Sequence, residues 1–231
     1  MATRGAAGAR GVQAGDGMMG MDLLFGRSVE RGPRRRRVYL TFDDGPNERA
    51  TAAILETLAT ERVPAAFFMV GDHVRRYPGL ARRVVSEGHL VGNHTHNHVK
   101  LHLAGPKRIR EQLEVAHNAI EWTTGRIPRA FRAPHGYRSP FLKSIIVDMR
   151  YTVFGWTFGV FDTAKPGVEE IRRRVRKRLR PGAIVLLHDG DGYDAEGDRL
   201  QTAHALPGII ADARNAGYEF GPLSELLSTH V

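Results

Sequence analysis

The sequence of 231 residues contains no cysteine, which excludes disulfide bonds and thiolate metal ligands. Any bound metal must therefore use histidine, aspartate or glutamate. The sequence also lacks an apolar run of about 18 residues, the length that a transmembrane helix needs. Residues 1–26 carry early arginines but no continuous apolar segment, so they do not resemble a signal peptide. We expect a cytoplasmic protein by sequence, or a secreted or cell-wall-facing one if the start is misassigned.

Acidic residues are fewer than basic ones, and the formal net charge is +9. Part of the excess lies in Arg34–Arg37 and part in the stretch 172–180. This charge is compatible with an anionic polymer as partner or with an ordinary solvated surface. Apolar residues recur every four positions within 169–180, which predicts an amphipathic helix with a narrow buried stripe. No nucleic-acid-binding motif accompanies the charge, so a nucleic acid is not expected as partner.

The composition and hydrophobic periodicity of the chain predict one large domain preceded by a tail. Residues 1–32 are rich in glycine, alanine and arginine and lack periodicity, so we expect a flexible tail followed by one domain over 33–231. Strands are predicted over 38–42, 65–70, 89–92, 130–132, 151–156, 183–188 and 218–220. Helices are predicted over 50–59, 78–86, 106–123, 140–149, 168–180 and 202–216. This alternation predicts an α/β fold with a parallel sheet, whose strand ends at the carboxyl side would hold the active site.

Two adjacent carboxylates, Asp43 and Asp44, follow the first predicted strand and precede Gly45-Pro46. Neighbouring side chains on an extended chain point in opposite directions, so the two carboxylates can take different roles. His94 and His98 follow another predicted strand and are four residues apart, which would place them on one face if the segment were helical. Two histidines and one carboxylate are the usual ligands of a catalytic zinc site with open positions. His96 would point elsewhere.

Three further segments place polar residues after predicted strands. Arg132 can pair with a carboxylate, and the turn Pro134-His135-Gly136 can present a backbone N–H to a ligand. The segment GWTFGVFDT contains Trp156 and Asp162, and His188 ends an apolar strand. A lone histidine at such a place is more often structural than catalytic. The acidic stretch 189–194 lacks the spacing of a calcium loop, and we expect a flexible loop near the groove.

The five segments, in this order and at these separations, resemble the polysaccharide deacetylases, which form carbohydrate esterase family 4 and share the NodB-homology domain. The resemblance covers roughly residues 36–228. It implies a distorted (β/α) barrel of about seven parallel strands and a bacterial, metal-dependent hydrolase that removes acetyl groups from an N-acetylated or O-acetylated carbohydrate. An acetylated glycan or amino sugar would be the substrate.

The resemblance also implies roles for individual residues. Asp44, His94 and His98 would bind one divalent metal, zinc by preference, although cobalt, nickel or iron suit the same ligands. Asp43 would be the general base, oriented by Arg132, and His188 the general acid, tuned by Asp162. The groove and the acetyl pocket would be formed by Pro134, His135, Trp156 and Leu186, with the backbone N–H of His135 helping to hold the oxyanion.

The sequence departs from the family at three places. His135 stands where tyrosine is common, Thr163 where an aromatic residue is common, and Gly159 where aspartate is common. These changes affect the expected substrate shape and the surroundings of His188 more than the reaction type.

Two other functions stay open at this point. One is an amidase or imidase that cleaves a small non-sugar C–N bond with the same fold. The other is a non-catalytic module that binds a glycan or nucleic acid, which only the +9 charge supports.

Overall fold

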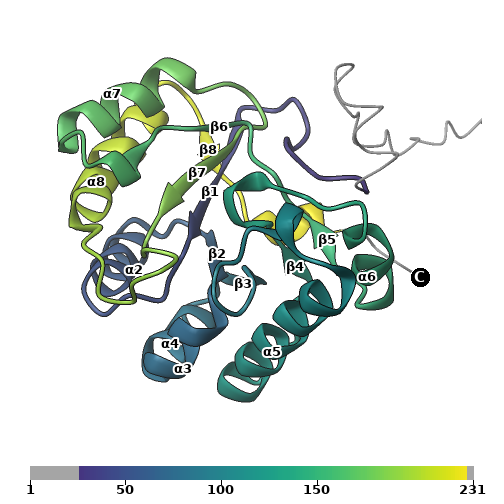
Figure 1. The fold of residues 1–231 in the computed structure, drawn as a ribbon. Helices are drawn as coiled ribbons and strands as arrows, with labels where there is room; N and C mark the ends of the chain where they lie inside the picture. The colour runs from purple at the N-terminus through teal and green to yellow at the C-terminus, as the bar shows by residue number, and fades with distance from the viewer. Residues whose placement is uncertain (1–25, 228–231) are drawn as a thin grey trace, which may run out of the picture.

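The computed structural model describes residues 26–227, in which strands and helices alternate (Figure 1). The strands are β1 (Arg37–Asp43), β2 (Ala65–Met69), β3 (Leu90–Asn93), β4 (Ala130–Phe131), β5 (Thr152–Val153), β6 (Phe158–Gly159), β7 (Ile184–His188) and β8 (Glu219–Phe220). The α-helices are α2 (Ala50–Glu61), α3 (Gly71–Arg76), α4 (Pro78–Ser86), α5 (Pro106–Thr124), α6 (Leu142–Asp148), α7 (Val168–Arg178) and α8 (Leu200–Asn215). Short 3-10 helices are η1 (Leu101–Leu103), η2 (Pro134–Gly136), η3 (Asp162–Ala164) and η4 (Leu223–Leu226).

Seven strands form one parallel sheet in the order β5-β4-β3-β2-β1-β7-β6, and β8 pairs with the start of β1. The central strand β1 pairs with β2 and β7, and this register sets Asp43 beside Phe68 on one side and beside His188 on the other. The sheet curves into an incomplete barrel with helices outside it (Figure 1). The expected distorted (β/α) barrel of seven parallel strands is confirmed. Its central strands place Asp43 and His188 together at the carboxyl end.

The core explains why the central strands are apolar along their whole length. Strands in a parallel sheet are covered on both faces, so they favour continuous apolar runs over alternation. Phe42 and Phe67 stack with ring centroids 5.1 Å apart, and both belong to the main core cluster with Ile54 of α2 and Leu206 of α8. Among the described residues, no helix is long and apolar enough to cross a membrane.

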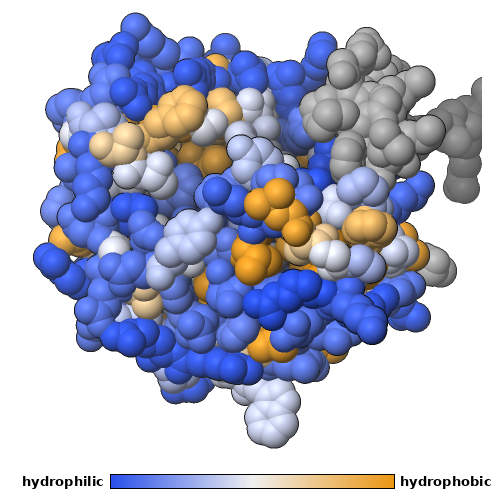
Figure 2. Space-filling model, viewed as in Figure 1, coloured by the Kyte–Doolittle hydropathy of each residue, from blue (hydrophilic) through white to orange (hydrophobic). Residues whose placement is uncertain are grey.

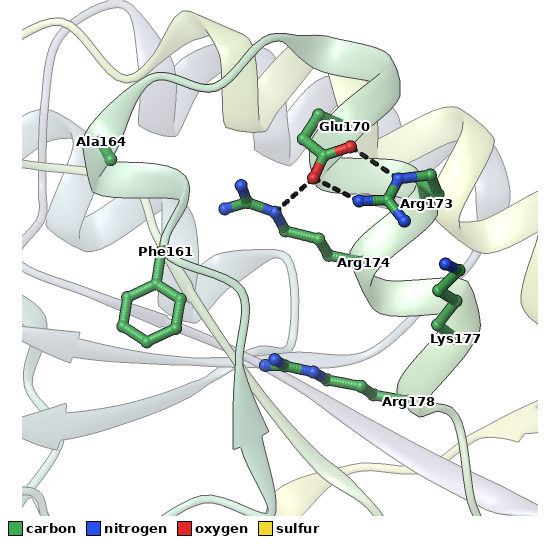
Figure 3. A pocket seen from close by; sticks show the side chains of 7 residues that line it. All are labelled: Phe161, Ala164, Glu170, Arg173, Arg174, Lys177 and Arg178. Atoms are coloured by element: carbon green, nitrogen blue, oxygen red, sulfur yellow. Dashed lines mark hydrogen bonds and ion pairs between the residues drawn. The ribbon is translucent and has the colours of Figure 1, made fainter.

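The sheet edge at β6 is covered by arginines. Arg174 and Arg178 of α7 and Arg180 donate side-chain hydrogen bonds to the carbonyls of Val160, Gly159 and Thr157. Arg174 and Arg178 also line a hollow of about 630 Å³ between α7 and the loop after β6 (Figure 3). An uncovered edge strand offers unpaired backbone groups to other chains. Much of the basic stretch 172–180 therefore has a structural role, and its apolar positions Ile171 and Val175 are buried as predicted.

Residues 26–32 pack on the domain, although they fall within the predicted tail. Val29 pairs with Phe154 and Arg31 with Ala183, so the segment lies across the gap between β5 and β7. The Val29 N–H donates to the Val153 carbonyl, and the Arg31 guanidinium donates to the Pro181 carbonyl. These bonds to backbone carbonyls leave no periodic pattern in the sequence, and they fix the segment. The remainder of the predicted tail, residues 1–25, lies outside the described residues.

One local prediction was wrong, and one short helix was not predicted. The strand expected over 151–156 is only Thr152–Val153, and the chain then turns to form β6, which was not expected. Gly155 marks the break, where a side chain would collide with Glu30. The helix α3 was also missed, because it has only six residues and they are mostly polar.

Candidate active site

The turn after β1 orients the two carboxylates differently. Asp43 is the last residue of β1, whereas Asp44 has a positive φ of 76° and precedes a cis Gly45–Pro46 bond. The left-handed conformation is costly for aspartate, so the surroundings must hold it. The ring of buried His73 bonds through Nδ1 to the Asp44 carbonyl at 2.8 Å. His73, which the sequence analysis did not select, thus helps to fix the direction of the Asp44 side chain.

His94 and His98 lie in a loop, so the helix considered for this segment is not formed. Thr95 and His98 have positive φ angles of 67° and 56°. The Asn93 side chain accepts a hydrogen bond from the Thr95 N–H at 2.8 Å. The side-chain Oε1 atom of Gln112 accepts hydrogen bonds from the backbone N–H groups of His96 and Asn97. A tightly bonded loop, and not helical spacing, therefore brings the two imidazoles together.

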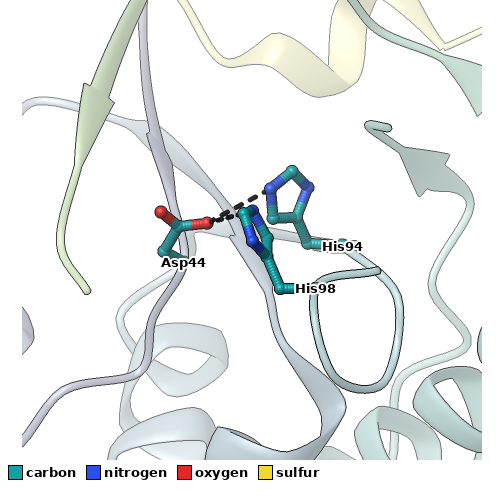
Figure 4. Close-up of side chains that lie close together, drawn as sticks. All are labelled: Asp44, His94 and His98. Atoms are coloured by element: carbon teal, nitrogen blue, oxygen red, sulfur yellow. Dashed lines mark ion pairs between the residues drawn. The ribbon is translucent and has the colours of Figure 1, made fainter. Parts of the chain in front are cut away.

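Asp44, His94 and His98 form a buried cluster in which three ligand atoms lie within 4.8 Å of one another (Figure 4). The Asp44 Oδ1 atom is 3.3 Å from His94 Nε2 and 3.0 Å from His98 Nε2, and it has no hydrogen-bond partner. His94 Nδ1 bonds to the Arg132 carbonyl at 2.8 Å, which directs the Nε2 lone pair to the cluster. His96 is outside the cluster, and its Nε2 atom lies 4.0 Å from Asp72 Oδ1.

The charge state of the cluster also fits a metal. Burial would raise the pKa of the Asp44 carboxyl, but the imidazoles of His94 and His98 hold that pKa well below its usual range. An ionised carboxylate with two imidazoles at open Nε2 atoms is the donor set of a mononuclear site with free positions. These three side chains would hold a divalent metal, and zinc, cobalt, nickel and iron all accept such ligands.

Asp43 is held by a fully buried arginine. Arg132 Nη1 donates to Asp43 Oδ1 at 2.6 Å and to Thr41 Oγ1 at 2.8 Å, and Nη2 donates to the Gly155 carbonyl. Burial lowers the pKa of Arg132, and the Asp43 charge opposes this effect. The second Asp43 oxygen, Oδ2, faces the metal-ligand cluster at 3.8 Å from His94 Nε2. One oxygen is thus anchored and the other is directed towards the reacting groups.

His188 and Asp162 form a second acid–base pair at the end of β7. His188 Nδ1 is 2.9 Å from Asp162 Oδ1. Asp162 Oδ2 accepts hydrogen bonds from the backbone N–H of His188 and from the Thr202 hydroxyl. Burial would lower the pKa of His188, but the Asp162 charge and hydrogen bond outweigh it and raise the pKa to about 9. This imidazole can carry a proton near neutral pH, with Nε2 free to donate it.

The predicted groove residues lie around these clusters. Pro134 is buried in η2, and the His135 ring packs edge-on against His98 at 4.7 Å between centroids. Trp156 lies beside Arg132, at 5.9 Å from its guanidinium carbon to the ring, and fills the space that a Cβ at Gly136 would need. Leu186 is two residues before His188 on β7 and therefore shares its face of the sheet. All predicted site residues thus surround one region, while their individual roles stay predictions.

The loop 189–199 contributes residues that the sequence analysis did not select. Tyr193 packs edge-on against His98 at 4.9 Å and bonds through its hydroxyl to His135 Nε2 at 2.9 Å. A Cβ at Gly192 would lie 2.3 Å from the His98 ring, so a glycine is needed for this approach. The loop was expected to be flexible, but Asn47 and Arg199 anchor it through hydrogen bonds.

Asp189, the first residue of this loop, is buried behind the turn of Asp44. Its Oδ2 accepts the Thr51 hydroxyl at 2.6 Å, and Oδ1 has no hydrogen-bond partner. Burial raises its pKa to about 7, with the Asp44 and Asp43 charges acting in the same direction. Its place directly after His188 was the only sequence signal that could have selected it.

The fold and the site together define a metal-dependent hydrolase. The family model for polysaccharide deacetylase matches residues 30–154. A chitooligosaccharide deacetylase from Bradyrhizobium is 39% identical to the chain over 198 residues, covering 83% of this chain and 90% of that protein. A peptidoglycan-N-acetylglucosamine deacetylase from Bacillus cereus is 36% identical over 193 residues, covering 82% and 87%. The chain belongs to the polysaccharide deacetylase family.

One solved structure that shares this fold is that of a pseudoenzyme. It is a carbohydrate esterase family 4 pseudoenzyme from Bacillus anthracis, with a TM-score of 0.79 and 28% identity, covering 87% of this chain and 69% of that one. Since one fold can host both active and inactive proteins, activity must be argued from the site. Here the Asp44–His94–His98 cluster that could hold a metal, the Asp43–Arg132 pair and the Asp162–His188 pair are all present.

Proposed function

We propose that this protein deacetylates N-acetylglucosamine units of a glycan, with zinc as its metal and Asp43 and His188 as base and acid. The observation that carries this proposal is the position of both groups beside the Asp44–His94–His98 cluster. Asp43 and His188 are paired residues of adjacent strands, so they flank the cluster from neighbouring positions. The names of the Bradyrhizobium and Bacillus cereus relatives, which specify chitooligosaccharide and peptidoglycan N-acetylglucosamine, support this substrate class.

Each residue of the two clusters and Asp43 has a defined task in the proposed reaction. A divalent metal held by Asp44, His94 and His98 would supply Lewis acidity for the acetyl carbonyl and lower the pKa of a bound water. Asp43, whose Oδ1 is held by Arg132, accepts the proton of the attacking water at Oδ2. His188, protonated at Nε2 and paired with Asp162 through Nδ1, donates a proton to the leaving sugar nitrogen.

Pro134, His135, Trp156 and Leu186 take the positioning tasks in the proposal. The His135 backbone is held in a left-handed turn with a φ of 57°, and its N–H serves the oxyanion that forms as the carbonyl is attacked. Trp156 and Leu186 provide the apolar surface for the acetyl methyl group. This surface would exclude water from the reacting carbonyl and so strengthen the electrostatic interactions there.

The test is acetate release from N-acetylglucosamine oligomers by metal-stripped protein, with and without added zinc or cobalt. The expected result is release that requires metal and that disappears in Asp43→Asn, a variant that keeps the shape of the side chain. Stoichiometric metal binding without acetate release from any acetylated glycan would contradict the proposal. Hydrolysis of small cyclic or linear amides, followed by the amine or carboxylate that forms, would then favour the amidase alternative.

A further inference from the structure

The side-chain amide of Asn93, directly before the first histidine of the cluster, ties that part of the chain to α5. Its Oδ1 accepts the Thr95 N–H at 2.8 Å. Its Nδ2 donates to the Leu113 carbonyl at 2.8 Å and to the Tyr151 hydroxyl at 2.9 Å. The bond to Thr95 spans His94, so it fixes the backbone on both sides of that histidine. Thr95 needs this support, because its positive φ of 67° is costly for a β-branched residue.

The Tyr151 hydroxyl continues this chain of hydrogen bonds towards the outer side of α5. It accepts from Asn93, so its own proton is left for His117 Nδ1, which lies 2.7 Å away. Burial lowers the pKa of the His117 imidazole, which favours the neutral ring that accepts this proton. The other ring nitrogen, Nε2, faces Glu121 Oε2 at 3.5 Å. This Asn93–Tyr151–His117 network therefore runs in one direction, from the loop after β3 to the surface of α5.

The inner part of the network is withdrawn from water. Figure 2 shows that hydrophilic side chains cover most of the face on which α5 lies in Figure 1, whereas Asn93 and Tyr151 are 0% and 2% exposed. A buried amide or hydroxyl that loses its partner is costly, so each group of the network sets the orientation of the next. Tyr151 lies between α6 and β5 and packs at 6.0 Å between ring centroids on Phe131. The support thus comes from outside the segments that carry the cluster.

We propose that Tyr151 and His117 are positioning residues for the loop 93–98, whose two cluster histidines would bind the metal. The inference rests on the metal site of the proposed function and adds to it two residues outside the cluster. Without the Tyr151 hydroxyl, the Asn93 amide would be free to rotate and would release the Thr95 N–H. Residues that orient metal-binding histidines typically change metal affinity about 10–100-fold, and Tyr151 acts through Asn93, so we expect about tenfold.

The deciding experiment compares two tyrosines that are buried to the same degree, Tyr39 at 1% and Tyr151 at 2% exposed. Tyr151→Phe removes the hydroxyl of the network, and Tyr39→Phe removes one that donates to Glu225 near the start of β1. Metal-stripped protein is titrated with zinc against a competing chelator. The zinc dissociation constant should rise about tenfold in Tyr151→Phe and by less than about twofold in Tyr39→Phe. Unchanged zinc affinity in Tyr151→Phe, or equal losses in both variants, would overturn the inference.

Two spectroscopic readouts report the geometry of the loop directly. The visible absorption of the cobalt-loaded protein depends on the arrangement of the ligands, so it should change in Tyr151→Phe and not in Tyr39→Phe. In metal-free protein, hydrogen exchange at the Thr95 N–H should be faster in Tyr151→Phe alone. A cobalt spectrum and an exchange rate equal to those of wild type would show that the hydroxyl does not hold the loop.

A pair of His117 variants tests the outer end of the network. The Oδ1 atom of an asparagine lies near the position of imidazole Nδ1, so His117→Asn keeps an acceptor for the Tyr151 proton. His117→Leu removes that acceptor. Zinc affinity should stay near the wild-type value in His117→Asn and fall by up to about tenfold in His117→Leu. Equal zinc affinities in the two variants would refute the role of His117.

These readouts separate the inference from the proposed function, because none of them uses acetate release. If zinc-loaded wild type releases no acetate, the proposed reaction fails, while zinc affinity and the cobalt spectrum still decide the network. If wild type binds neither zinc nor cobalt, the metal site and this inference fail together. If acetate is released and Tyr151→Phe binds zinc as wild type does, only the network is refuted.

Discussion

Two clusters of aspartate and histidine lie side by side in this protein and are built in opposite ways. In the metal-ligand cluster, Asp44 Oδ1 lies between two imidazole Nε2 atoms and has no hydrogen-bond donor. In the pair of Asp162 and His188, the carboxylate accepts three hydrogen bonds. A buried polar atom without a partner costs free energy unless a ligand satisfies it. The first cluster is therefore arranged for a cation and the second for a proton.

The two clusters also differ in where their parts come from. Asp44, His94 and His98 follow β1 and β3 and lie within residues 30–154, the part that the family model matches. Asp162 and His188 lie beyond it and are joined across β6 and β7. The register of β1 with β7 sets Asp43 beside His188, so the sheet itself places the proposed base next to the proposed acid.

The largest effect is expected from removing a metal ligand. His98→Ala should lose stoichiometric zinc and reduce acetate release to background, because two donors no longer complete the site. His96→Ala is the matched control, since His96 lies in the same loop but outside the cluster. Metal content by elemental analysis, together with acetate release, checks both variants. Retention of zinc by His98→Ala at wild-type affinity would show that the cluster is not the metal site.

His188→Ala should separate the two clusters. The variant is expected to bind zinc as wild type does and to lose about 10²–10⁴-fold in kcat, the usual contribution of a positioned acid. The reason is that His188 is bonded to Asp162 and is not one of the three metal ligands. Elemental analysis of metal content and acetate release check both expectations. Simultaneous loss of zinc and activity would mean that the clusters are one unit and that His188 has a different role.

Asp162→Asn should remove a pH dependence of stability. In metal-free protein the pKa of His188 is raised from 6.5 to about 9, against the effect of burial, mainly by the Asp162 charge. The resulting stabilisation is complete below pH 6.5 and is lost as the pH rises through about 9. It amounts to at most about 3 kcal/mol. Urea unfolding between pH 6 and 9.5 should show this decline in wild type and a flatter curve in Asp162→Asn. The raised pKa of His94 adds a slope of the same sign to both proteins.

Parallel slopes in the two proteins would show that Asp162 does not set the charge of His188. In zinc-loaded enzyme the cation would lower the pKa of His188, so the alkaline limb of kcat/KM should lie below pH 9. Asp162→Asn should shift that limb to lower pH still, because the imidazolium loses its partner.

The sequence predicted which residues form both clusters better than it predicted their geometry. Strongly apolar strands such as 38–42 and 183–188 gave the sheet, and the residues at their ends gave Asp43, Asp44 and His188. The helix considered for His94 to His98 is absent, because side-chain bonds from Asn93 and Gln112 determine that loop. Such contacts join residues up to 16 positions apart and leave no periodic pattern.

The residues that were missed share this property. His73 supports Asp44 through a bond to its carbonyl across 29 positions. Tyr193 reaches His135 across 58 positions, and its loop has no regular structure. Strand β6 has only two residues, and its edge is covered by arginines that the sequence presented as a charged helix. Tertiary contacts of single side chains determine these features, and no local propensity encodes them.

The smallest effect is expected in the pair of Asp162 and His188, because Asp162 Oδ2 accepts hydrogen bonds from two donors. Thr202→Val removes the hydroxyl bonded to Asp162 Oδ2 at 2.8 Å but leaves the His188 N–H on the same oxygen. Unfolding free energy should fall by about 1 kcal/mol, the net value of one hydrogen bond. Zinc content should not change, and kcat should fall far less than in His188→Ala. Urea titration and acetate release measure both quantities. A loss of activity as large as that of His188→Ala would mean that Asp162 is held by Thr202 alone. A graded loss here, beside the complete loss in His98→Ala, would establish that several hydrogen bonds share the support of Asp162, whereas removal of His98 alone abolishes metal binding.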